Sequence, residues 1–227
     1  MTAVESSLQR YLGEVELAAY TFYLWKSIND LALKERTILD LLNRNALSWQ
    51  VMMHSLQCTF FISLGRIFDR NSKSFSVHKL LGTCKEKIHE FSKEQVRSRK
   101  GGHGPEPEWL DKYMANTYEA TVRDFDPIED DVAKWAEVFK RIYQPIRHKV
   151  FAHKDLKYID ASHSLFGQSN TCEVEDMLAF LYAIQRYIFE LFYNGKKCRL
   201  TDFQHTGEER VSADVRSLLE ALRPIQS

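Results

Sequence analysis

The chain has 227 residues, of which 44% are hydrophobic and 27% are charged, so it can bury a substantial core beneath a well-solvated surface. Lysine and arginine number 31 together, as do aspartate and glutamate, and the net charge is zero. Bulk electrostatic attraction therefore cannot explain nucleic-acid binding, and any such site must be a local patch. Nine glycines and five prolines favour long regular elements over a many-turned β fold.

The cysteines and the apolar stretches exclude several further classes. Cys58, Cys84, Cys172 and Cys198 are far apart and form no Cys-x-x-Cys pair, so neither a disulfide framework nor a structural metal is expected. The N-terminus lacks the basic start and apolar stretch of a signal peptide. The most apolar segment, residues 60–68, is too short to span a bilayer. We expect a cytoplasmic protein with no cofactor, no metal and no membrane contact.

Helical periodicity dominates the N-terminal half. Apolar residues recur at three- and four-residue steps from about residue 8, and Thr2 or Ser6 can begin that helix. A later long helix is apolar around most of its circumference, which is typical of a helix at the centre of a bundle or one that faces a subunit partner. Ser74 or Ser76 can cap the helix after it. The predicted helices span residues 2 to 32, 34 to 42, 46 to 68 and 76 to 99.

The C-terminal half continues the all-α pattern. Asp126-Pro127 is a helix start, whereas Pro145 should kink the helix or begin a new one and push Gln144 out of helical angles. Thr171 is the expected cap of the last long helix, and Asn194-Gly195 is its stop. The predicted helices span residues 106 to 121, 126 to 144, 173 to 193 and 212 to 222. These patterns predict one all-α domain over residues 1–227, with four to five long helices and short accessory helices.

A basic stretch precedes the glycine-rich segment Gly101–Pro105. No strand comes before these glycines and no Gly-Lys-Ser/Thr follows, so the segment is not a phosphate-binding P-loop. It reads either as a flexible connector or as a basic arm that touches an RNA backbone. The basic stretch that precedes the glycines contains four cations, which are Lys93, Arg97, Arg99 and Lys100.

The segment Gln144–Asp155 concentrates the chemistry of the chain. It places Arg147 and His153 six positions apart. An arginine holds a phosphate oxygen in a bidentate fork and never loses its charge, and a histidine transfers a proton near neutral pH. Over a phosphodiester these two groups suffice to cut RNA without a metal, with the ribose 2′-hydroxyl as nucleophile. Spacing alone also fits surface or capping roles.

Two separated stretches carry a family resemblance. The run IRHKVFAHKD at residues 146–155 resembles the arginine–polar–x–histidine signature of the HEPN superfamily. Members are all-helical, and many are metal-independent ribonucleases of toxin and defence systems. The stretches at residues 64–70 and 74–81 are similar to the abortive-infection, Abi U-type branch of phage-defence proteins. The resemblance implies an HEPN-like helical bundle and a homodimer that places two motifs in one groove.

The resemblance also implies roles for individual residues. Arg147 and His153 become the catalytic pair. Lys149 shares a helical face with His153 and suits a phosphate contact. His148 takes the polar position after the arginine, where relatives often have Asn or Asp. Asp155 could orient the imidazole of His153 by accepting its second ring proton, or could serve as a helix cap or surface pair.

One departure limits what the resemblance implies about regulation. Toxins of this superfamily that pair with a nucleotidyltransferase antitoxin carry a tyrosine two residues after the histidine. Here that position is Asp155, so nucleotidylation of the tyrosine cannot be carried over. An antitoxin or defence-system partner therefore stays unassigned.

Arg66, Asp69 and Arg70 end the helix predicted over 46–68. In one interpretation the arginines neutralise its negative C-terminal end and Asp69 pairs with one of them. In the other, Arg66 or Asp69 faces the catalytic groove as support or as an RNA contact.

Two functions remain in competition. Positions 147 and 153 lie about 120° apart on an uninterrupted helix, so the pair converges only if the helix ends early or if two chains share the groove. The first hypothesis is a homodimeric endoribonuclease of the toxin or phage-defence type that acts on RNA. The second is a non-catalytic helical module that binds RNA, a nucleotide or a protein partner. A third class, a metal hydrolase, is not favoured because the sequence shows no set of metal ligands.

Overall fold

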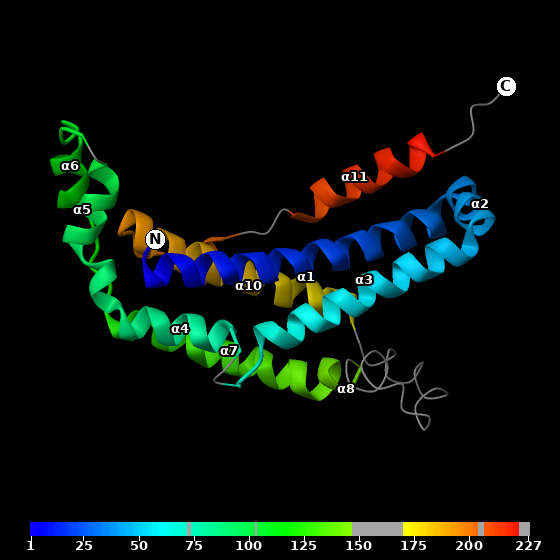
Figure 1. Cartoon of the computed structure of the whole chain (residues 1–227), viewed down its shortest axis with the longest axis horizontal. Helices are drawn as coiled ribbons and strands as arrows, with labels where there is room; N and C mark the ends of the chain where they lie inside the picture. Colours follow the sequence, from blue (N-terminus) through cyan, green and yellow to red (C-terminus); the bar gives the residue numbers. More distant parts are fainter. Residues whose placement is uncertain (72–73, 103, 147–169, 204–206, 223–227) are drawn as a thin grey trace.

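The protein is all-α, as predicted. The computed structural model describes residues 1–71, 74–102, 104–146, 170–203 and 207–222, and every regular element in those ranges is helical (Figure 1). The α-helices are α1 (Ala3–Lys34), α2 (Arg36–Arg44), α3 (Ala46–Ile67), α4 (Val77–Glu86), α5 (Lys93–Gly101), α6 (Leu110–Ala115), α7 (Asp126–Val138), α8 (Gln144–Ile146), α10 (Thr171–Asn194) and α11 (Gly207–Ala221). Short 3-10 turns are η1 (Ile88–Phe91), η2 (Val122–Phe125) and η6 (Leu200–Asp202), and η3 (Phe139–Tyr143) is a π-helical turn.

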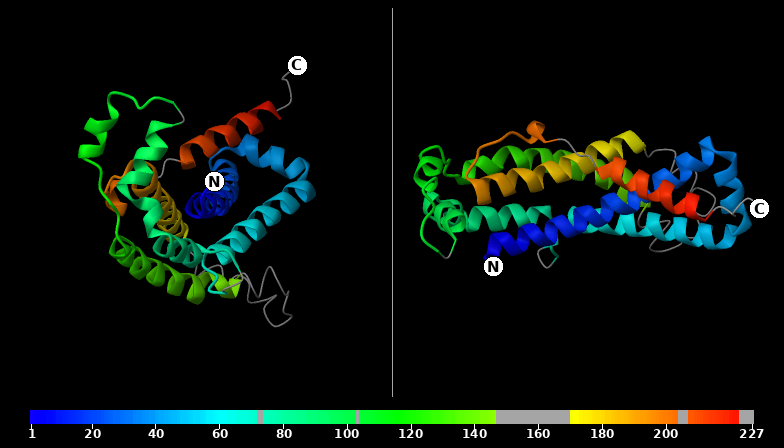
Figure 2. Two further views of the ribbon diagram at one scale, coloured as in Figure 1. Left: turned by 60° about the vertical axis from the view of Figure 1, so that its left-hand side comes forward. Right: turned by 90° about the horizontal axis from the view of Figure 1, so that it is seen from above.

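Helix α1 is the axis of the bundle. Thr2 starts it with a capping box, in which its hydroxyl accepts from the Glu5 backbone N–H at 3.2 Å while the Glu5 carboxylate accepts from the Thr2 N–H at 3.3 Å. Seen nearly end-on, α1 lies inside a ring of α2, α3, α4, α10 and α11 (Figure 2, left), and it contacts all five. A helix surrounded in this way must be apolar on several faces, which explains the wide apolar arc of its sequence.

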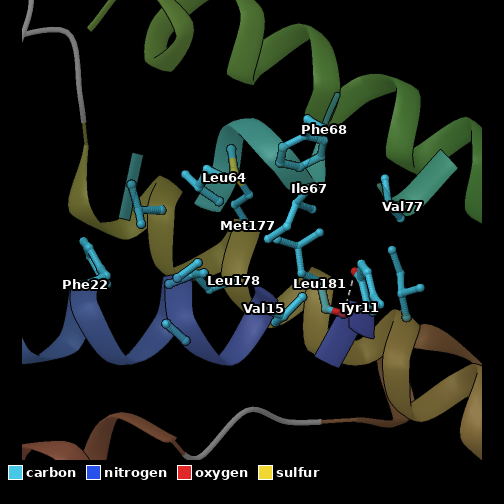
Figure 3. Close-up of a cluster of buried hydrophobic side chains, with 14 of the residues drawn as sticks. Tyr11, Val15, Phe22, Leu64, Ile67, Phe68, Val77, Met177, Leu178 and Leu181 are labelled. Carbon is cyan, nitrogen blue, oxygen red and sulfur yellow. Dashed lines mark hydrogen bonds between the residues drawn. The ribbon is translucent and has the colours of Figure 1, made fainter. Parts of the chain in front are cut away.

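The core lies between α1, α3 and α10 (Figure 3). Tyr11 of α1 is fully buried, and its hydroxyl donates to the Leu181 carbonyl of α10 at 3.0 Å. This hydrogen bond satisfies the only polar group of a large buried side chain. The near-heptad stripe of α10 points into the same core, and its buried members are Met177, Leu178, Leu181, Ile184, Ile188 and Leu191.

Helix α3 is buried along only part of its length. Its C-terminal half packs into the core through Phe60, Phe61 and Leu64. Near its N-terminus, by contrast, Leu47 is 75% exposed and Val51 is 58% exposed. Both predicted roles of an apolar helix therefore meet on α3: half of it is central, and half presents an apolar face to the surface.

The helix predicted over 76–99 is divided into three pieces. Ser76 does cap α4, accepting from the Lys79 N–H. However, α4 ends before Lys87, and Ser92 leaves helical angles to cap α5 with its own side chain. The periodic apolar residues are buried as expected, but the serine competes with the helical backbone and starts a new element.

Three further boundaries differ from prediction. Of the helix predicted over 106–121, only α6 forms, because the Tyr118 N–H bonds to the Gly195 carbonyl at 2.7 Å instead of continuing a helix. The cap of α10 is Asn170 rather than Thr171, since the Asn170 side chain accepts from the Cys172 N–H. Helix α11 starts at Gly207, before the predicted residue 212, and packs on α1.

Gly195 ends α10 in the left-handed conformation at φ +55°, as its sequence position predicted. We expect Gly195→Ala to lower the free energy of unfolding by about 1–2 kcal/mol or more, because an added Cβ would meet the Thr117 side chain and the new residue would keep a positive φ. Urea or thermal unfolding measures this. The matched control is Gly13→Ala on the open surface of α1, which should stabilise by about 0.5–1 kcal/mol. Equal effects of both changes would contradict the argument.

Candidate functional site

Most of the sequence-predicted site lies outside the described residues. That applies to both members of the proposed catalytic pair and to their three neighbours, Arg147, His148, Lys149, His153 and Asp155. The structure does describe the chain up to Ile146 and again from Asn170, and it places Arg66 and Asp69. The described part of the site therefore consists of the elements that lead into the motif at Ile146 and out of it at Asn170.

The approach to the motif is one helical path with a π turn. Helix α7 continues through η3 into α8, and Tyr143 and Ile146 are fully buried. Pro145 has no N–H and its ring obstructs the carbonyl four residues earlier, so the preceding turn widens. Gln144 keeps helical angles at φ −63° and ψ −41°, which corrects the prediction that it would leave them. The proline thus changes the pitch of the helix without ending it.

The departure from the motif is joined to the approach by a hydrogen bond. The Tyr143 hydroxyl donates to Glu173 Oε2 at 2.9 Å, and Glu173 lies in the first turn of α10. Burial first, and then the carboxylate of Glu173, raise the pKa of Tyr143 well above its ordinary value, while a backbone hydrogen bond from Asn170 opposes them. The phenol therefore stays protonated and donates. Both ends of the motif-bearing stretch are held at the same corner of the bundle.

An aromatic cavity of about 280 Å³ opens at this corner, between α1, α3, η3 and the start of α10. We call it the aromatic cavity, and its ring-bearing walls are Phe22, Trp25, Phe60, Phe61 and Tyr143. Its polar lining residues are Thr21, Gln57, Asn170 and Thr171. None of these described lining residues carries a charge, so they suit a neutral and flat group.

A second hollow lies toward the C-terminal end of α3 and has mixed charge. This polar groove, with a volume of about 430 Å³, contains Asp69, Arg70, Glu137, Lys140 and Gln144 among its lining residues. Phe68 and Phe139 are stacked beneath it with ring centroids 5.5 Å apart. Acidic and basic side chains balance along its walls, so it offers an anion no net attraction.

The two predicted accessory residues separate in space. Asp69 lines the polar groove near Gln144, but its carboxylate accepts from the Asn71 N–H at 2.9 Å, and no arginine of the described residues pairs with it. Arg66 points toward α1, where Nη1 is 3.4 Å from Glu14 Oε1 in a largely exposed pair. Such a surface pair contributes little stability. Of these two residues, only Asp69 lies beside the approach to the motif.

The basic stretch before the glycine-rich segment is tied to the protein. Arg97 binds Glu106 and Asp111, Arg99 donates to backbone carbonyls, and Lys100 donates to the Asn194 side chain. Because these cations already hold neighbouring elements together, the connector interpretation fits better than an arm that reaches for RNA.

Sequence reasoning missed Tyr143 and Glu173. Tyr143 continues the buried stripe of Phe139 and Ile146 at helical spacing, so its burial could have been predicted. Its bond to Glu173 could not, because the two residues are 30 positions apart. No group of three or more His, Cys, Asp or Glu side chains in the described part of the chain could hold a metal, and none of its helices is long and apolar enough to cross a membrane.

We expect Tyr143→Phe to loosen this corner selectively. It removes a hydrogen bond to a carboxylate, which stabilises by about 1–3 kcal/mol, and it should speed amide exchange at residues 144–146 and 170–173. The control is Tyr193→Phe, which removes a similar bond to Glu5 at the far end of α10. Hydrogen-exchange mass spectrometry compares the two. If Tyr193→Phe loosens the same peptides equally, Tyr143 does not anchor them.

The comparisons with known proteins identify the family. A family model described as AbiU2, of the HEPN type, matches residues 2–196, which is most of the chain. The match includes α1 to α10 and the whole motif-bearing stretch, and it ends before α11. No curated protein and no solved structure gives a significant match. The all-helical fold and the matched range agree with both resembling stretches of the sequence, and the chain belongs to the AbiU2 family of HEPN proteins, the abortive-infection branch.

Proposed function

We propose that this protein is a metal-independent endoribonuclease of the phage-defence or toxin type. The observation that carries the proposal is the family match over residues 2–196, which contains the Arg147–His153 motif without interruption. The anchoring of both flanks by Tyr143 and Glu173 supports it, because a catalytic pair must be held in a defined geometry to act.

The proposed chemistry needs two side chains and the substrate's own nucleophile. The ribose 2′-hydroxyl loses its proton as its oxygen attacks phosphorus. The bond to the 5′-oxygen of the next nucleotide breaks, and that oxygen takes up a proton. His153 moves these protons as acid or base, and Arg147 stabilises the charge that grows on the phosphoryl oxygens. The products are a 2′,3′-cyclic phosphate and a 5′-hydroxyl. In this proposal Lys149 contacts a neighbouring phosphate, and His148 and Asp155 orient the pair.

A homodimer is part of the proposal. Positions 147 and 153 diverge on a continuous helix, so residues from two chains can complete one groove. The exposed end of α3 supports self-association, because Leu47 and Val51 are exposed and no charged residue occurs between Ala46 and Gly65. Two copies of an uncharged apolar face can meet across a two-fold axis without like-charge repulsion.

The second candidate is a non-catalytic module that binds RNA, a nucleotide or a protein partner. The zero net charge favours it, since a protein that grips RNA along its backbone needs excess cations. The polar groove adds to this, because Asp69 and Glu137 offset Arg70 and Lys140. In this reading Arg147 and His153 are structural, and their replacement lowers the unfolding temperature and has no effect on any cleavage.

We expect Arg147→Ala and His153→Ala each to lower RNA cleavage about 100-fold or more, which is the contribution of one such group. The assay uses a long single-stranded RNA with excess chelator and detects the cyclic phosphate. Matched controls remove the same side-chain types elsewhere: Arg141→Ala on the exposed side of η3 and His89→Ala after α4. Wild-type rates in both motif variants, with a contaminating nuclease excluded, would refute the catalytic role.

We also expect the two inactive variants to complement each other. If the groove takes Arg147 from one chain and His153 from the other, subunit exchange between the variants rebuilds one site in each mixed dimer. Half of the dimers are mixed and each has one of two sites, so activity should return to about a quarter of wild type. Light scattering confirms the dimer beforehand. An inactive mixture after proven exchange would place both residues of each pair on one chain.

A further inference from the structure

The aromatic cavity has no function in the chemistry proposed so far. It opens in the wall of the bundle with a volume of about 280 Å³, which is near the lower end for small-molecule sites. It has room for one ring system and not for an extended ligand.

The walls of the cavity are suited to stacking. Phe22 and Phe60 lie with ring centroids 5.3 Å apart, and Phe61 and Tyr143 lie 6.3 Å apart. Phe22 stands at the edge of the core cluster on α1 (Figure 3), so the core itself holds the wall rigid. Trp25 is half-buried and is the aromatic side chain most accessible to a ligand. Flat faces of this kind stack with the bases of single-stranded RNA.

The rim of the cavity can read the edge of a ring. Gln57 projects from α3, and within the described residues no hydrogen bond holds its carboxamide. A carboxamide offers a donor and an acceptor side by side, which matches the edge of a nucleobase. The Asn170 side-chain oxygen already accepts from the Cys172 N–H as the cap of α10, so Gln57 is the lining amide with both polar atoms left for a base edge among the described residues.

The uncharged side chains that line the aromatic cavity favour the base of a nucleotide over its phosphate. None of the described residues that line this cavity is acidic or basic, so these residues offer a phosphate no counter-ion. A neutral base loses little on entering an apolar cavity and gains stacking. The phosphate would stay outside, on the side where Asn170 borders the motif-bearing stretch.

We infer that the aromatic cavity binds a single unstacked nucleobase of RNA, next to the phosphate that Arg147 and His153 act on. The inference rests on the proposed ribonuclease function and adds a base-specificity pocket to it. Trp25 supplies the stacking surface, Gln57 reads the edge of the base, and Tyr143 joins the cavity to the motif through its bond to Glu173. RNA would then be cut immediately 5′ or 3′ of one preferred base.

Binding is tested first, with ligands that cannot be cleaved. The four nucleoside 5′-monophosphates and ribose 5-phosphate are added in turn to the full wild-type chain, and saturation-transfer NMR reports which ligand protons touch the protein. We expect saturation to be strongest on base protons, one nucleotide to bind best, and ribose 5-phosphate to give no signal. Equal saturation from ribose 5-phosphate, or no binding of any nucleotide, overturns the inference.

Single-residue variants then test whether the nucleotide binds in the aromatic cavity. Trp25→Ala should weaken the preferred nucleotide about tenfold, and Trp25→Phe should retain most of the affinity. Trp135→Ala is the matched control, because Trp135 is also half-buried but packs on Phe180 away from the cavity. Gln57→Ala should reduce the preference among the four bases, whereas Gln50→Ala on the exposed face of the same helix should not. If Trp135→Ala weakens binding as much as Trp25→Ala, the cavity is not the site.

Cleavage mapping separates failure of this inference from failure of the proposed function. On RNA of mixed sequence, wild type should cut beside one preferred base, and Gln57→Ala should cut with that preference reduced while total cleavage persists. Cleavage with no base preference in wild type refutes the pocket and leaves the nuclease standing. Nucleotide binding that depends on Trp25 without any cleavage refutes the nuclease and leaves the pocket standing.

Discussion

The packing of α1 against five other helices is the constraint on which the rest of the structure depends. One helix of 32 residues contacts α2, α3, α4, α10 and α11, and its tyrosine hydroxyl at position 11 bonds directly to the backbone of α10. Because the buried residues of α1 are mainly apolar, the helices that cover them must present apolar side chains in return. This requirement sets the positions of α3 and α10, and these two helices with α1 form the corner where the motif begins and ends.

At this corner, the described helices form a frame around the two ends of the motif-bearing stretch, which contains the proposed catalytic pair. The π turn before Pro145 keeps the helix intact up to Ile146, and the first turn of α10 receives the Tyr143 hydroxyl. A buried phenol that donates to a carboxylate is a stronger link than a neutral pair. The hydrogen bond between Tyr143 and Glu173 therefore holds the two described flanks of the motif-bearing stretch together.

The balanced charge of the chain limits the ways in which it could bind RNA. A chain with equal numbers of acids and bases cannot attract RNA over its whole surface. Among the described residues, the polar groove repeats this balance locally, and the aromatic cavity is lined by uncharged side chains. In the function proposed above, stacking and edge contacts with a base would supply selectivity, and the Arg147–His153 motif would supply reactivity.

The sequence by itself determined the helical class and several helix ends, and the chemistry of the motif stays a prediction. Thr2, Ser76 and Gly195 act where they were expected, because caps depend on a few neighbouring residues. Only the tertiary structure decided that residues 76–99 break at Ser92, that Gln144 stays helical, and that Asn170 lies beside Tyr143. Those outcomes depend on contacts between residues far apart in the chain, and local periodicity contains no information about such contacts. The aromatic cavity is of the same kind, since its walls come from four elements that meet only when the bundle closes around α1.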